Sequence, residues 1–220
     1  MFKRSEVKQL FPVFVWVQEL EDDVAGPLNE HLREQAVRLK PAAADSRPPA
    51  TGWQTRNDLQ TLPEFGQMAE IIQAATQKVL EFLRVAPTPY EITGCWMNVT
   101  PPGAGHPLHG HPNNYLSGVY YVTTPSGADH IMFNDFRMER QTILPHFTER
   151  VPQNLSMDRM PVSEGSLIIF PAWLPHSVEP SAAETDRISL SFNIMFTDFT
   201  QALARPIWSP EDASATGDNP

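Results

Sequence analysis

The stretch HGHPNNYLSGVYY, residues 109–121, combines a pair of histidines with the beginning of a strand-like run. That run, Tyr115–Thr124, is rich in aromatic and β-branched residues, which favour strands. On a strand, side chains two residues apart point to the same face, so His109 and His111 could both reach one metal ion. The spacing therefore predicts a metal site on a β-sheet.

Two histidines do not complete such a site, and the best candidate for a third ligand is His176. It ends the sequence FPAWLPH (170–176), which follows the strand-like run Ser166–Phe170. A side chain placed just after a strand and a turn is expected at the mouth of a barrel. An H-x-H pair alone could equally sit in a surface loop, and the late His176 and Arg187 are what favour the metal site.

The run RISLSFN (187–193) alternates strictly between polar and apolar residues. One face carries Arg187, Ser189, Ser191 and Asn193, and the other carries Ile188, Leu190 and Phe192. In an exposed sheet the polar face would only be solvated, whereas in a barrel it could line a ligand cavity. If Arg187 points into such a cavity, it could bind a carboxylate, because its planar guanidinium group donates two parallel hydrogen bonds.

The rest of the chain divides into early helices and later strands. The apolar spacing predicts helices over Leu28–Leu39, with Asp22 and Asp23 at its start, and over Glu64–Arg84. The expected strands are Leu10–Gln18, Glu91–Thr100, Tyr115–Thr124, His130–Asn134, Ser166–Phe170 and Arg187–Phe196. This order indicates a mainly β protein, a barrel or sandwich with helices packed on one face.

The composition of the chain argues against some classes of function. The chain has 220 residues, 41% of them apolar, a net charge of −10 and one cysteine, Cys95. The acidic balance without a Lys/Arg cluster argues against nucleic acid and against an anionic membrane surface. With no signal-like N-terminus and no apolar run of roughly 18 residues, the expected location is cytoplasmic. We expect one domain over residues 1–208 and a disordered tail over 209–220.

Five segments together resemble the iron(II)/2-oxoglutarate-dependent oxygenases, and more narrowly a bacterial and phage family of that class. They are GWQT (52–55), WMN (96–98), HGHPNNYLSGVYY (109–121), FPAWLPHSVEP (170–180) and RISLSFN (187–193). The resemblance implies a double-stranded β-helix, the jelly-roll barrel related to cupins.

The resemblance also implies roles for single residues. His109 corresponds to the first iron ligand and His176 to the last, while His111 stands where relatives usually have Asp or Glu. Arg187 corresponds to the residue that binds the distal carboxylate of 2-oxoglutarate, and Tyr121 to a tyrosine beside the same carboxylate. The further cofactor-binding candidates are Asn98, on the strand before the ligands, and Ser189, on the same face as Arg187.

The implied function is that of an oxidoreductase, an iron(II)- and 2-oxoglutarate-dependent dioxygenase that hydroxylates a small-molecule or peptide substrate, with a homodimer as the expected assembly. Because His111 replaces a carboxylate, a three-histidine, cupin-type dioxygenase without 2-oxoglutarate is the first alternative. The second is a non-catalytic, cupin-like binding module. Asp135, after the run His130–Asn134, is a fallback carboxylate ligand.

The other four histidines are expected outside the metal site. His31 falls on a predicted helix surface and His146 in a loop. His130 opens a strand and could be exposed, and a Pro-Gly segment separates His106 from any regular strand.

Overall fold

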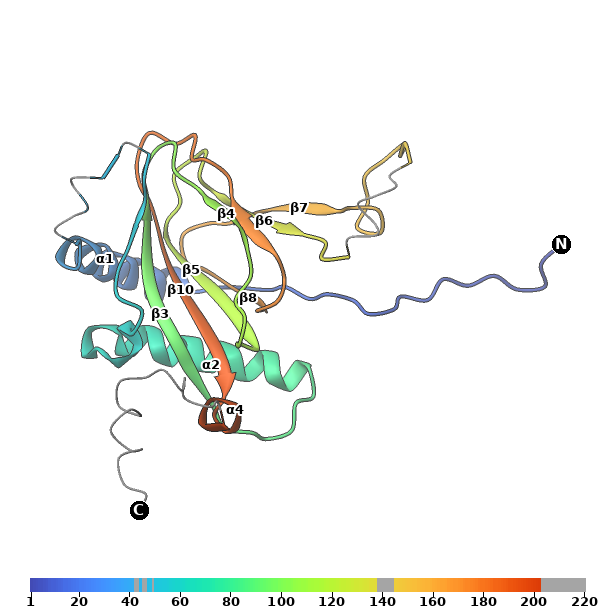
Figure 1. The fold of residues 1–220 in the computed structure, drawn as a ribbon, viewed down its shortest axis with the longest axis horizontal. Helices are drawn as coiled ribbons and strands as arrows, with labels where there is room; N and C mark the ends of the chain where they lie inside the picture. Colours follow the sequence, from blue (N-terminus) through green and yellow to red (C-terminus); the bar gives the residue numbers. More distant parts are fainter. Residues whose placement is uncertain (42–43, 45–46, 49, 138–144, 203–220) are drawn as a thin grey trace, which may run out of the picture.

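Two antiparallel sheets face each other in the computed structural model, and helices cover the outer face of the larger sheet (Figure 1). The structure describes residues 1–41, 44, 47–48, 50–137 and 145–202, so the expected tail over 209–220 lies outside the described residues. This arrangement confirms the prediction of a mainly β jelly roll with helices on one face.

The larger sheet has six strands, and each neighbouring pair is antiparallel. In spatial order they are β1 (Trp16–Glu19), β8 (Ser166–Pro171), β5 (Leu116–Thr123), β10 (Arg187–Phe196), β3 (Tyr90–Thr100) and β2 (Trp53–Gln54). The four long strands at its centre are those that the sequence predicted, because each combines strand-forming residues with an apolar face.

The smaller sheet has four short strands. In spatial order they are β4 (His106–His109), β9 (His176–Val178), β6 (His130–Asn134) and β7 (Met157–Pro161). The sequence predicted only β6, since the other three are short, contain or adjoin proline and lack regular alternation.

Two long helices, α1 (Asp22–Arg38) and α2 (Gly66–Phe82), pack against the larger sheet. The acidic pair Asp22 and Asp23 occupies the first turn of α1, as predicted, where negative side chains favour the helix dipole. Two short 3-10 helices, η2 (Leu59–Thr61) and η3 (Pro63–Phe65), precede α2, and α4 (Thr197–Ala202) follows β10. No helix in the described part of the chain is both long and apolar enough to cross a membrane.

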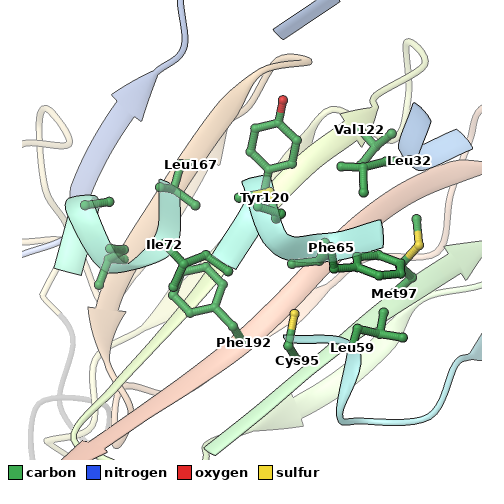
Figure 2. Packing of buried hydrophobic residues seen from close by; sticks show 14 of the residues in the cluster. Leu32, Leu59, Phe65, Ile72, Cys95, Met97, Tyr120, Val122, Leu167 and Phe192 are labelled. Atoms are coloured by element: carbon green, nitrogen blue, oxygen red, sulfur yellow. The ribbon is translucent and has the colours of Figure 1, made fainter. Parts of the chain in front are cut away.

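The main hydrophobic core lies between these helices and the sheet (Figure 2). Ile72 of α2 and Leu32 of α1 contribute from the helices, and Tyr120 and Phe192 from the sheet. A second cluster lies on the opposite face of the sheet, where Tyr121 and Phe170 pack with Phe133 of the smaller sheet. One face of the larger sheet thus packs against the main core, which stabilises the fold. The opposite face is available for a functional site.

Two details of the sequence prediction were wrong. The first strand covers Trp16–Glu19 rather than Leu10–Gln18, because β8 offers partners only to these four residues, and Leu10 is 67% exposed. The second predicted helix, Glu64–Arg84, spans Gly66–Phe82 instead, and its last residue, Phe82, is 56% exposed with its ring packed edge-on against Phe14 and Trp16.

One buried hydrogen bond fastens α1 to the sheet. The Tyr120 hydroxyl donates to Asn29 Oδ1 over 2.8 Å, and both residues are buried. Tyr120→Phe leaves that amide oxygen without a donor, so we expect the free energy of unfolding in urea to fall by about 1–3 kcal/mol. The control Tyr115→Phe, at a partly exposed ring, should change it by less than about 0.5 kcal/mol. Equal effects of the two substitutions would contradict this account.

Cys95 lies in the core, paired across the sheet with Phe192 (Figure 2), with 1% of its surface exposed. Burial raises the pKa of the Cys95 thiol to about 12, so the reactive thiolate does not form at ordinary pH. We expect no reaction of the native protein with a thiol-specific reagent at about pH 8, and complete reaction once guanidinium has unfolded it. Rapid labelling of the native protein would show that the core opens at this point.

Candidate active site

Three histidines from separate parts of the chain meet at one point between the sheets. The ligating nitrogens of His109, His111 and His176 all lie within 4.8 Å of one another. His109 is the last residue of β4 and His176 the first of β9, and the register of the smaller sheet pairs them directly. The structure therefore brings together the three histidines that the sequence singled out.

Backbone carbonyls orient two of the rings. Nδ1 of His109 lies 2.8 Å from the Pro107 carbonyl oxygen, and Nδ1 of His176 lies 2.9 Å from that of Leu174. A carbonyl oxygen can only accept, so the proton sits on Nδ1 and Nε2 keeps its lone pair. This is the arrangement by which proteins fix a metal-binding imidazole in one tautomer and orientation.

His111 does not lie on the strand with His109, as the sequence analysis assumed. β4 ends at His109, and the His111 amide N–H instead donates to the Ala172 carbonyl oxygen over 2.8 Å. A Cβ on Gly110 would lie 3.4 Å from that same oxygen, which shows how near the two chain segments lie. The H-x-H pair converges through a contact with the loop before β9, and not through strand alternation.

The surroundings of His111 and His176 favour the neutral form of both imidazole rings. Burial lowers the pKa of His111 to about 4, and the nearby His109 charge acts in the same direction. Burial also lowers the pKa of His176 to about 4, although its bond to the Leu174 carbonyl opposes the shift. Neutral imidazole is the form that binds a metal ion, so protons do not compete for these two residues near neutral pH.

The three histidines open onto a cavity of about 60 Å³ enclosed by both sheets. Its polar wall comes from the larger sheet, and its apolar residues include Val119, Ile131 and Phe170. The lining residues are Gln54, Trp96, Asn98, Thr100, His106, His109, His111, Gly118, Val119, Ile131, Phe170, His176, Val178, Arg187, Ser189 and Ser191. Arg187, Ser189 and Ser191 of the polar face of β10 thus line a cavity, which is one of the two possibilities that its alternation left open, while the apolar face joins the core.

Asn98 and Ser189 are neighbours in this wall, paired across β3 and β10. The Asn98 side chain is largely engaged, since Oδ1 accepts from Gln54 and Trp96, at 2.7 and 3.2 Å, and Nδ2 donates to Ser191 over 2.9 Å. Asn98 therefore lines the cavity where the sequence placed it, but as the centre of a network that holds other wall residues.

Arg187 lines the cavity, whereas Tyr121 is not among the lining residues and lies behind it, in the second hydrophobic cluster. Arg187 is 3% exposed, and its Nη1 donates to the His130 carbonyl oxygen over 3.0 Å. No carboxylate among the described residues forms an ion pair with it. Its guanidinium carbon lies 5.1 Å from the centre of the Tyr121 ring, whose buried hydroxyl has no hydrogen-bond partner among the described residues.

The structure also locates several residues that the sequence analysis did not assign to the metal site. His106 opens β4 and lines the cavity, although a Pro-Gly segment was expected to separate it from a strand. His130 is buried, against expectation, and its Nε2 lies 2.8 Å from Glu179 Oε2. Asp135, the fallback ligand, pairs with Arg137 over 2.8 Å and does not line the cavity. Gln54 and Trp96 were quoted only as parts of motifs, and no spacing signal marked them as cavity residues.

Solved structures with the same fold come from 2-oxoglutarate oxygenases. A prolyl-4-hydroxylase from Pseudomonas putida is 17% identical, with a TM-score of 0.56 over 83% of this chain and 92% of that one. HygX from Streptomyces hygroscopicus, with nickel and 2-oxoglutarate bound, is 14% identical, with a TM-score of 0.56 over 84% and 83%. A Trichoplax adhaerens prolyl hydroxylase in complex with a hypoxia inducible factor peptide fragment is 10% identical, with a TM-score of 0.59 over 87% of each chain. At these identities the likeness establishes the fold.

Sequence comparison adds the family. No curated protein sequence matches the chain. Residues 94–193 match the family described as "Putative 2OG-Fe(II) oxygenase", and this segment runs from β3 into β10. It contains the three clustered histidines as well as Tyr121 and Arg187. Over this segment the chain is similar to the 2OG-Fe(II) oxygenase family.

Proposed function

We propose that this protein is an iron(II)- and 2-oxoglutarate-dependent dioxygenase whose metal ligands are His109, His111 and His176. In this proposal Arg187 and Tyr121 bind the distal carboxylate of 2-oxoglutarate, and the reaction hydroxylates a small-molecule or peptide substrate. The family and the fold supply the class of reaction. The contacts of individual residues support the assignment of roles.

The donor set fits iron(II). Imidazole nitrogens suit iron among the first-row metals, and two of the three rings already hold their Nε2 lone pairs toward the cavity. Three neutral ligands leave both positive charges of the metal uncompensated by the protein. A dianion such as 2-oxoglutarate would balance this charge, so His111 in place of a carboxylate is compatible with the cosubstrate.

The observation that carries the proposal is the buried Arg187 in the same cavity as the three histidines. A buried cation without a paired carboxylate is costly, and a ligand carboxylate would satisfy it. The unpartnered Tyr121 hydroxyl adds a second donor beside it. Burial raises the pKa of Tyr121, so this hydroxyl stays protonated and can donate.

When bound, iron(II) and 2-oxoglutarate would activate oxygen, the oxidant: oxidative decarboxylation of 2-oxoglutarate to succinate and carbon dioxide supplies part of the electrons that reduce oxygen, and hydroxylation of the substrate supplies the rest. The protein's residues position the reactants. The three histidines hold the metal, and Arg187 and Tyr121 fix the far end of the cosubstrate. Val119, Ile131 and Phe170 exclude water from the wall of the cavity.

The three-histidine dioxygenase without 2-oxoglutarate is the alternative with the most support, because no carboxylate belongs to the triad. In that reading Arg187 would bind the substrate or a structural acid. No carboxylate among the described residues forms an ion pair with Arg187, which favours the substrate for this role. A non-catalytic binding module would not require three converging imidazoles in one cavity with a buried arginine.

Oxygen uptake distinguishes the two enzymes. Iron-loaded protein should consume oxygen faster when 2-oxoglutarate is added, and should form succinate in proportion to the oxygen consumed. The reaction can be followed with an oxygen electrode and by chromatography of succinate, with metal-free protein as the control. Oxygen uptake that 2-oxoglutarate does not change would support the three-histidine dioxygenase instead.

The substrate class is the least constrained part of the proposal. HygX has been solved with hygromycin B bound, and the Trichoplax prolyl hydroxylase with a peptide, so the fold accommodates both kinds of molecule. The homodimer, the cytoplasmic location and the single domain over residues 1–208 stay predictions from the sequence.

A further inference from the structure

His106 occupies an unexpected position beside the proposed metal ligands. In a regular strand, residues three apart point to opposite faces, so His106 and His109 should lie on opposite sides of β4. The register between β4 and β9 shifts between these two residues, and both side chains line the same cavity. Irregularities of this kind often redirect a side chain next to an active site.

The His106 ring has unused hydrogen-bonding capacity. Neither of its nitrogens has a hydrogen-bond partner among the described residues, in contrast to Nδ1 of His109 and His176. Burial lowers the pKa of His106, and the charges of His109 and Arg187 lower it further. An imidazole ring carries at least one N–H donor in either protonation state, so His106 can donate to a ligand.

The small cavity brings any ligand close to this donor. His106 lines it together with the three proposed metal ligands and with Arg187. A dicarboxylate that joins the metal to Arg187 would lie in this cavity, within the lining to which His106 belongs.

We infer that His106 is a further cosubstrate-binding residue, whose ring N–H donates to a carboxylate oxygen of 2-oxoglutarate from the β4 side of the cavity. This inference rests on the proposed function. His106 is not a metal ligand here, because it lies outside the group of three histidines whose nitrogens converge.

Anaerobic calorimetry with 2-oxoglutarate and iron(II)-loaded protein tests the inference. His106→Leu fills the space without a donor and should raise the Kd for 2-oxoglutarate roughly tenfold or more, as for loss of a hydrogen bond to a charged group. His106→Gln keeps a side-chain N–H and should recover most of the affinity. Leu108→Ala, on the exposed side of the same strand, is the control and should bind like the wild type.

The Kd for iron(II), measured separately, should be the same in all four proteins. An unchanged Kd for 2-oxoglutarate in His106→Leu would overturn the inference, and so would equal weakening in the Leu and Gln variants. If the wild type itself fails to bind 2-oxoglutarate, the proposed function fails. If the wild type binds 2-oxoglutarate and His106→Leu binds it with the same Kd, only the proposed role of His106 fails.

Discussion

Replacing His176 with alanine should abolish retention of iron(II) while the protein stays folded. His176 supplies one of three converging nitrogens and is 5% exposed, so no surface group can replace it. Loss of a residue that merely supports a metal ligand weakens metal binding by about 10–100-fold, and loss of a ligand itself should cost more. Iron content after gel filtration, measured by plasma emission spectrometry, gives the result, and circular dichroism checks the fold.

His109→Ala should behave in the same way, because its nitrogen belongs to the same group. His146→Ala is the matched control, since His146 is exposed and does not line the cavity. Full iron occupancy in the His176 and His109 variants would refute the assignment of the metal site.

Replacing Arg187 with alanine should leave iron binding intact and weaken 2-oxoglutarate binding by roughly 100-fold. The guanidinium is buried in the cavity without a carboxylate partner among the described residues, so its charge is available to the cosubstrate. Arg187→Lys keeps the positive charge but loses the planar guanidinium group, and should give an intermediate Kd for 2-oxoglutarate.

Arg38→Ala, an exposed position on α1, is the control for loss of one positive charge. Because Arg187 also donates to the His130 carbonyl, thermal unfolding of each variant must be measured beside the titration. A Kd that Arg187→Ala does not change, in a protein as stable as the wild type, would move carboxylate binding to another residue.

The sequence was most informative about the larger sheet. Long strands such as β10 bury one face against the helices, and this burial imposes an alternation that can be read directly. The strands β4, β7 and β9 have three to five residues each. They are strands because their backbones pair with neighbouring strands, and their sequences show no regular alternation of polar and apolar residues. Their positions depend on contacts between distant segments, which a local pattern does not contain.

The same distinction applies to the candidate site. Residue type and order were sufficient to select His109, His111 and His176, but the assumed strand geometry of the H-x-H pair was wrong. His111 reaches the site through its backbone bond to Ala172, and His106 through an irregularity in β4. Both depend on the loop and strand that follow Phe170, about sixty residues further along the chain.

The most direct test of the central claim is anaerobic titration of the iron(II) protein with 2-oxoglutarate, followed by the visible charge-transfer absorption that chelation of the metal produces. We predict a band that saturates at one equivalent of 2-oxoglutarate, that is absent in His176→Ala, and that requires a much higher concentration in Arg187→Ala. Iron held firmly by the three histidines with no such band at any concentration would contradict the assignment of 2-oxoglutarate as the cosubstrate.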